Sequence, residues 1–295
     1  MNVITQLLAD REILVADGSW GTQLAARGLP AGQAPEQWNL DNPDAVRALG
    51  ADYVAAGADM ILTNTFGGNP LKLDKVGLGG RAIEINRIGA ALSREAAGND
   101  ALVIGSIGPT GEFIQPLGLI SEDEMVAVFA EQVRGLADGA VDAILVETQT
   151  DLDEARAAIR ATRDNFDGPV ICSMTFDKGS AGYATMMGVK PEQAAQDLEA
   201  AGADIVGANC GAGADLVVGV ISLMRPATDL PLWAKPNAGL PELIKGETVF
   251  KETPEQMAAR FPDLVEAGAS IIGGCCGTTP DHIRALVAAR DQFLG

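Results

Sequence analysis

The sequence is poor in aromatic residues and contains a single histidine. Phe, Trp and Tyr make up 4% of the 295 residues, so Val, Ile, Leu and Met must fill any core. One histidine excludes a multi-histidine metal site and leaves His282 as the only candidate base for a Ser-His-Asp triad. His282 follows Thr-Thr-Pro-Asp at the start of the last helical pattern. That position indicates a surface or N-terminal helix residue rather than a catalytic one.

Basic residues are also scarce. The sequence has 21 Lys and Arg residues against 40 Asp and Glu residues, a formal net charge of -19. Such a surface repels phosphate backbones and anionic lipid, so nucleic acids and membranes are unfavourable partners, and we interpret the charge as an aid to solubility. No run of about 18 apolar residues is present, and the first residues lack the basic and long apolar regions of a secretory signal. We therefore expect a cytoplasmic protein whose cysteines are thiols rather than a disulfide framework.

What the sequence does contain is a regular alternation of short apolar segments with longer amphipathic ones. Continuous apolar runs are typical of strands buried on both faces of a parallel sheet. The amphipathic segments carry helix signals, such as a capping box of Ser121 and Glu124. Gly recurs where helices are expected to end, in residues 56–59, 139–142 and 202–204. The predicted strands are 13–21, 59–66, 101–111, 142–150, 169–176, 204–211, 231–239 and 270–278.

Eight β/α units in about 280 residues predict a single (β/α)8 barrel. We expect one domain over residues 1–295, because no linker or low-complexity stretch divides the chain. The rival fold, a doubly wound open sheet, usually has fewer strands and a glycine fingerprint after its first strand, which is missing here. The longest loops are expected at residues 179–188 and 241–253.

Polar residues follow nearly every predicted strand, where a barrel of this kind places its chemistry. Glu147 ends a very apolar strand and Asp17 ends the first strand, so both carboxylates need a partner. Two carboxylates that face a cationic group predict recognition of a substrate ammonium, and a general acid–base pair is the competing interpretation. For Asp17, an Asx-turn or helix cap is a further alternative.

Cysteines form the most specific pattern. Cys210 ends the sixth predicted strand, and Cys275 and Cys276 end the eighth. Three thiolates with a fourth position open are the ligand set of a catalytic zinc site. Adjacent strand residues point to opposite faces, so the backbone must leave the pleat at this pair, and the neighbouring glycines permit that. The alternatives are a vicinal disulfide, buried thiols, or a phosphate cradle at Gly273–Gly274. Cys172, in the middle of a strand, is expected to be a plain buried thiol.

Several motifs resemble the homocysteine S-methyltransferase family. They span nearly the whole chain in order: DGSWGTQL (17–24), ILTNTFGGN (61–69), GSIGPTGE (105–112), ETQTDLDEA (147–155), MTFD (174–177), ANCG (208–211), KPNAG (235–239) and GGCCGTTPDHI (273–283). Among family members, TNTFG, IGPTGE and PNAG are most similar to the homocysteine-binding module of cobalamin-dependent methionine synthase.

The resemblance implies a (β/α)8 barrel that transfers a methyl group to homocysteine and forms methionine. It assigns zinc binding to Cys210, Cys275 and Cys276. It places the amino group of homocysteine at Glu147, with Asp17 and Gly18 in the same pocket. Asn237, after the seventh strand, is expected to occupy or border the fourth zinc position, or else to serve only its tight turn.

The methyl donor stays open at this point. The motifs cover a homocysteine-binding module alone, so either a partner protein supplies methylcobalamin or a small donor enters directly. Betaine, dimethylsulfonium compounds and S-methylmethionine would need an aromatic, cation-binding mouth, for which Trp20 is the one candidate near a strand end. A non-enzymatic alternative is a subunit that presents homocysteine within a larger assembly. A different acceptor thiol is a further possibility.

Overall fold

The computed structural model describes residues 2–244 and 247–295. Within these residues, eight parallel strands form one sheet in the order β1-β12-β9-β8-β5-β4-β3-β2. Every strand lies inside a segment that the sequence predicts as a strand, except that the last begins one residue earlier. The strands are β1 (Leu14–Val15), β2 (Met60–Leu62), β3 (Leu102–Ile107), β4 (Ala143–Gln149), β5 (Val170–Met174), β8 (Ile205–Cys210), β9 (Leu232–Pro236) and β12 (Ala269–Ile272).

The two ends of this strand order also meet. Ala16 forms a parallel bridge with Met60. The Asp17 N–H donates to the Met60 carbonyl at 3.0 Å, and the Asp59 N–H donates to the Val15 carbonyl at 2.8 Å. A parallel sheet whose edges pair with each other is a barrel, so the predicted (β/α)8 fold is confirmed and the open doubly wound sheet is excluded.

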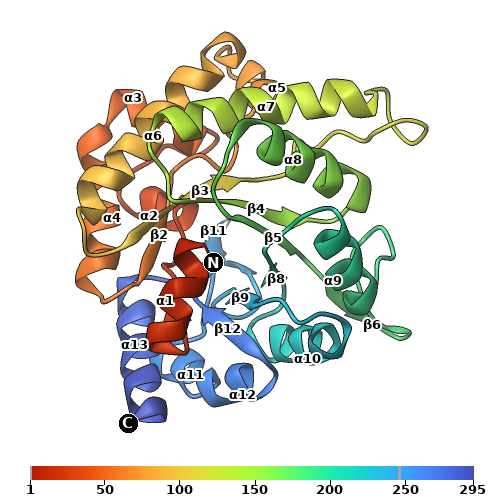
Figure 1. Cartoon of the computed structure of the whole chain (residues 1–295). Helices are drawn as coiled ribbons and strands as arrows, with labels where there is room; N and C mark the ends of the chain where they lie inside the picture. The colour runs from red at the N-terminus through yellow and green to blue at the C-terminus, as the bar shows by residue number, and fades with distance from the viewer. Residues whose placement is uncertain (1, 245–246) are drawn as a thin grey trace.

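Helices surround the barrel and connect its successive strands (Figure 1). They are α1 (Val3–Arg11), α2 (Gly21–Ala26), α3 (Trp38–Asp41), α4 (Pro43–Ala55), α5 (Pro70–Asp74), α6 (Ala82–Ala97), α7 (Glu122–Asp138), α8 (Leu152–Asn165), α9 (Pro191–Ala200), α10 (Ala214–Met224), α11 (Pro254–Ala258), α12 (Phe261–Glu266) and α13 (Pro280–Leu294). Short 3-10 turns lie at η1 (Pro35–Gln37), η2 (Gly79–Arg81) and η3 (Arg225–Ala227). No helix in the described part of the chain is both long enough and apolar enough to cross a membrane.

The helix signals of the sequence act largely as predicted. Ser121 caps α7, where its backbone N–H donates to Glu124 Oε2 at 2.8 Å and its hydroxyl accepts from the Glu124 N–H. After α4 and α9, Gly57 and Gly202 adopt positive φ, the conformation that ends a helix at low cost. After α7, Gly139 is the C-cap as predicted, although the positive φ falls on the next residue, Ala140.

A buried carboxylate stabilises the amino end of the barrel. Asp59 precedes β2 and accepts a hydrogen bond from the Val15 N–H at 2.7 Å. It forms ion pairs with Arg11 and with Arg290, the latter at 2.7 Å. A charge buried at this depth requires such partners. This end of the barrel is therefore occupied by structural contacts, and the opposite end remains for chemistry.

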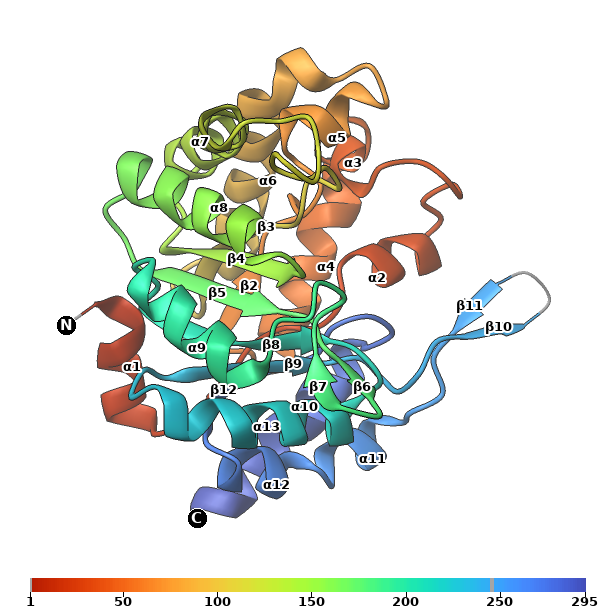
Figure 2. The same cartoon turned by 90° about the vertical axis from the view of Figure 1, so that its right-hand side faces the viewer.

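The two segments predicted as the longest loops contain short β-hairpins, so the prediction of loops was wrong in part. The segment 179–188 begins within an antiparallel hairpin of β6 (Asp177–Gly179) and β7 (Gly182–Ala184). The segment 241–253 contains a second hairpin of β10 (Glu242–Ile244) and β11 (Glu247–Val249), whose residues 245 and 246 lie outside the described residues. Figure 2 shows this second hairpin projecting away from the barrel. Both segments lack the continuous apolar pattern of the barrel strands, because their residues are mostly exposed.

Candidate active site at the carboxyl ends of the strands

A cavity of about 550 Å³ lies at the carboxyl ends of the barrel strands. Its wall combines sulfur, charged and aromatic side chains contributed by most of the strand ends. The residues considered below that line it are Gly18, Trp20, Glu36, Phe66, Lys72, Ser106, Glu147, Thr148, Cys210, Lys235, Gly274, Cys275 and Cys276. The volume far exceeds that of a single small amino acid, so two reactants can meet in it.

Three cysteine sulfurs converge on this cavity. The Sγ atoms of Cys210, Cys275 and Cys276 all lie within 4.8 Å of one another. The backbone leaves the strand before the pair, as the sequence predicted, because β12 ends at Ile272. The turn requires Gly274, where an added Cβ would lie 2.4 Å from the Thr278 hydroxyl oxygen. The described cysteines are free thiols, so the structure has no vicinal disulfide.

Hydrogen bonds within the cluster divide its protons unequally. Donation from Cys275 and Cys276 lowers the pKa of the Cys210 thiol far below its ordinary value, because both bonds stabilise a thiolate there. The bonds to Cys210 raise the pKa of Cys275 and of Cys276. Cys172, buried in β5, has its pKa raised by burial alone, as expected of an inert core thiol.

Asn237 contacts the cluster directly. Its Nδ2 donates to Cys210 Sγ at 3.5 Å and to the Gly211 carbonyl at 2.8 Å. Its Oδ1 accepts from the Cys276 N–H at 2.9 Å. The side chain therefore ties both cysteine-bearing segments together and borders the sulfurs.

Glu147 lies beside the cluster with 5% of its surface exposed. The Ser106 hydroxyl donates to its Oε1 at 2.5 Å, which is the one hydrogen bond to this carboxylate from the described residues. Burial raises the pKa of Glu147, while the nearby Lys235 ammonium and the Ser106 hydrogen bond oppose that rise. A buried carboxylate with so few donors is suited to accept a cationic group from a ligand.

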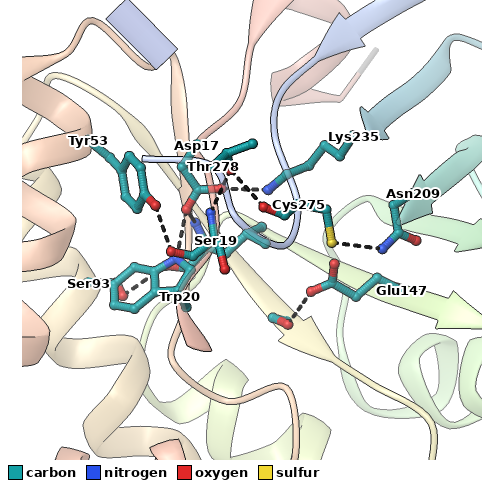
Figure 3. Close-up of polar contacts among 12 residues, drawn as sticks. Asp17, Ser19, Trp20, Tyr53, Ser93, Glu147, Asn209, Lys235, Cys275 and Thr278 are labelled. Atoms are coloured by element: carbon teal, nitrogen blue, oxygen red, sulfur yellow. Dashed lines mark hydrogen bonds and ion pairs between the residues drawn. The ribbon is translucent and has the colours of Figure 1, made fainter. Parts of the chain in front are cut away.

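Asp17 is fully buried and does not line the cavity. Figure 3 shows the polar side chains that surround its carboxylate. Its Oδ2 accepts from Trp20 Nε1 at 2.8 Å and from the Leu62 N–H at 2.7 Å. Its Oδ1 pairs with Lys235 Nζ at 2.7 Å. Gly18, the next residue, does line the cavity. The sequence did not identify Lys235 as a partner, although a lysine inside an apolar strand was a signal that it needs a buried counter-charge.

The cavity lining also includes residues that sequence reasoning missed. Glu36, from η1, is 4% exposed and accepts from the Gly67 N–H at 2.6 Å. Lys72 lies 5.4 Å from the centre of the Phe66 ring. Glu36 and Lys72 end no predicted strand, so their positions along the sequence gave no sign that they line the same cavity as the cysteines.

His282 lies in the first turn of α13, as expected of an N-terminal helix residue, but it is buried rather than at the surface. It is 5% exposed, and its Nδ1 accepts from the Thr279 N–H at 3.2 Å in a capping box at the start of α13. Its Nε2 lies 3.0 Å from the Glu252 carbonyl oxygen. The imidazole is buried because it joins α13 to the segment before α11, and it does not line the cavity.

Comparisons with known proteins identify the family of this chain. Residues 14–290 match the family model of homocysteine S-methyltransferase. The chain is 34% identical over 300 residues to methionine synthase of Mycobacterium tuberculosis and 31% identical over 306 residues to that of Mycobacterium leprae. These alignments cover 95% and 97% of this chain but 25% of each relative, so the chain spans a quarter of the length of these curated relatives.

Solved structures show the same likeness. The crystal structure of the homocysteine methyltransferase MmuM from Escherichia coli, in its metallated form, superposes with a TM-score of 0.82 at 25% identity over 97% of this chain and 99% of that one. The oxidized form of MmuM gives a TM-score of 0.82 over 98% and 99% of the two chains. On the family match, the sequence identity and the shared fold, this chain is a methyltransferase that belongs to the homocysteine S-methyltransferase family.

Proposed function

We propose that this chain is a cytoplasmic, zinc-dependent enzyme that methylates the thiol of homocysteine to give methionine, with residues 1–295 acting as one domain. The observation that carries the proposal is the convergence of Cys210, Cys275 and Cys276 within 4.8 Å of one another, beside the poorly solvated Glu147. The sulfur cluster matches the chemistry of a thiol acceptor, and the carboxylate matches its ammonium group.

The cysteine cluster fits a zinc ion. Three thiolates are soft ligands that favour zinc over hard cations. All three residues line the cavity, which leaves a fourth position toward a substrate. The amide of Asn237 donates to Cys210 Sγ, as expected of an outer residue that orients a metal ligand. When bound, zinc would promote deprotonation of a coordinating thiol and keep its sulfur electron-rich.

The protein groups then orient the acceptor. Glu147 accepts the substrate ammonium, and Ser106 holds the carboxylate in place. Lys235 keeps its ammonium against Asp17 and lines the same cavity, so it is available to the acceptor carboxylate. Asp17 acts through Lys235 and Trp20 rather than by direct contact, since it does not line the cavity.

The methyl group is proposed to come from methylcobalamin on a separate carrier, so that this chain is the homocysteine-binding part of a divided methionine synthase. The support for this donor is the likeness of the chain to two methionine synthases. A small onium donor that enters the cavity directly is the second candidate, because the aromatic side chains of Trp20 and Phe66 line the cavity.

The test is methionine formation from homocysteine by the zinc-loaded chain, with free methylcobalamin as the sole donor. Turnover is the expected result, and the Cys275→Ala variant should lose zinc and turnover together. Betaine and S-methylmethionine, offered separately, test the onium alternative. Full activity in a metal-free Cys275→Ala protein would refute the zinc-dependent mechanism. Zinc and homocysteine binding without turnover on any soluble donor would favour a strict requirement for a carrier protein, or a subunit that only presents homocysteine.

A further inference from the structure

Asn209, the residue before Cys210, uses its whole side chain in the site. Its Oδ1 accepts from the Thr148 N–H at 2.9 Å and from the Ser173 hydroxyl at 2.7 Å. Its Nδ2 donates to Thr148 Oγ1 at 2.8 Å. The same Nδ2 approaches Cys275 Sγ at 3.7 Å (Figure 3). A backbone N–H can only donate, so the bond from Thr148 fixes which end of the amide is oxygen. The NH₂ group is thereby directed at the sulfur.

The segment that Asn209 holds is irregular. β4 pairs with β5 up to Val146 and again at Gln149, with a shift in register between them. Thr148, inside this gap, has a φ of +61°, a conformation that β-branched residues rarely adopt. The Asn209 amide accepts a hydrogen bond from the Thr148 N–H and donates one to the Thr148 hydroxyl, at a point where the regular pairing of β4 with β5 is interrupted. It therefore stabilises the turn that directly follows Glu147.

One side chain thus contacts both halves of the site. Toward β4 it fixes the backbone that carries Glu147, and toward the β12 loop it contacts a sulfur of the cysteine cluster. We propose that Asn209 is a positioning residue that sets the separation between the Cys275 sulfur and the Glu147 carboxylate, and so selects the length of the acceptor amino acid. This inference rests on the proposed function, because it takes the acceptor to place its thiol on a zinc ion held by the cysteine cluster and its ammonium on Glu147.

The inference has a specific consequence for cysteine, which is one methylene shorter than homocysteine. If the two groups are held at a fixed separation, cysteine cannot reach both at once. One methylene in a well-formed site discriminates by roughly 10- to 200-fold. Loosening the separation should reduce that discrimination, which a purely structural role for Asn209 would not do.

The experiment compares the wild type with Asn209→Ala and with Ser106→Ala as the matched control. Ser106 contacts Glu147 but no cysteine, so its loss should weaken homocysteine binding and leave zinc affinity within about twofold of wild type. Zinc affinity is measured by competition with a chromophoric chelator. Binding of homocysteine and cysteine is measured by calorimetry on zinc-saturated protein.

For Asn209→Ala we expect the zinc Kd to rise roughly 10- to 100-fold, as for other outer residues that orient metal ligands. The homocysteine Kd should rise about 10-fold, and the ratio of cysteine Kd to homocysteine Kd should fall by a similar factor. An unchanged ratio, or a homocysteine Kd equal to that of wild type once zinc is saturating, would overturn the inference.

A second variant covers failure of Asn209→Ala to fold. Thr148→Val keeps Asn209, the backbone N–H and the β-branched shape, and removes only the Oγ1 acceptor. The zinc Kd and the homocysteine Kd of this variant should both rise, by smaller factors than in Asn209→Ala. Wild-type values for both of these constants would overturn the inference. A wild type that binds neither zinc nor homocysteine would overturn the proposed function as well. Normal binding by the wild type with no effect of the variants would overturn this inference alone.

Discussion

Replacing Lys235 by Met should destabilise the barrel by isolating a buried charge. Lys235 Nζ lies 2.7 Å from Asp17 Oδ1, and the side chains are 2% and 0% exposed. Methionine is apolar and has a similar length to lysine, so the substitution removes the ammonium group but little side-chain volume. The substitution also removes the cation–π contact between the Lys235 ammonium and the Trp233 ring, whose centre lies 5.6 Å away.

The magnitude follows from what Asp17 retains. Removing one partner of a buried ion pair costs about 3–5 kcal/mol, because the other charge is left uncompensated. Asp17 keeps the hydrogen bonds from Trp20 Nε1 and the Leu62 N–H, so we expect the lower end of that range. About 3 kcal/mol corresponds to a fall in Tm of roughly 6 °C for a chain of this size.

The assay is thermal and urea unfolding of four proteins. Lys235→Met should lose about 3 kcal/mol, and Asp17→Asn with Lys235→Met should recover much of it, because neither charge then remains. Arg284→Met is the control, since its pair with Asp281 is exposed and should contribute less than about 1 kcal/mol. If Lys235→Met lies within about 1 kcal/mol of wild type, the Asp17 carboxylate does not depend on this partner and the reasoning fails.

Three further outcomes can be checked. Gly274→Ala should cost about 1–3 kcal/mol by overpacking, since the added Cβ lies 2.4 Å from Thr278 Oγ1, and the zinc content after dialysis should fall with the Tm. Burial raises the pKa of Glu147 in the folded protein above its ordinary value of 4.5. The folded state then binds more protons than the unfolded state, so the free energy of unfolding should fall as pH rises from 4.5 through the folded-state pKa. Glu147→Gln should remove this dependence, be more stable near pH 7 and lose homocysteine affinity, and an unaltered stability–pH curve would contradict the assignment. After chelator treatment, iodoacetamide should modify Cys210 first, because hydrogen bonds lower its pKa, and peptide mapping that found Cys275 modified first would count against the cluster geometry.

The sequence by itself determined the barrel and its principal chemical groups. Continuous apolar runs located all eight strands to within one residue at their starts, because burial on both faces leaves a local signature in the sequence. The same reasoning placed Cys210, Cys275 and Glu147 at the carboxyl ends of strands. Closure of a parallel barrel brings such ends to one rim, so their convergence could be expected without coordinates. The motifs added the family, which the comparisons then confirmed.

Tertiary structure alone decided how these groups are held and which of them face the cavity. Asp17 was expected to contact substrate, yet its carboxylate is saturated by Lys235 and two further donors and does not line the cavity. The bonds from Asn209 to Thr148 and Cys275 join residues 61 and 66 positions apart. Glu36 reaches the cavity from a 3-10 turn that carries no strand pattern. Periodicity reports the burial of an element, whereas these contacts depend on side-chain directions across the closed barrel, which no local pattern encodes.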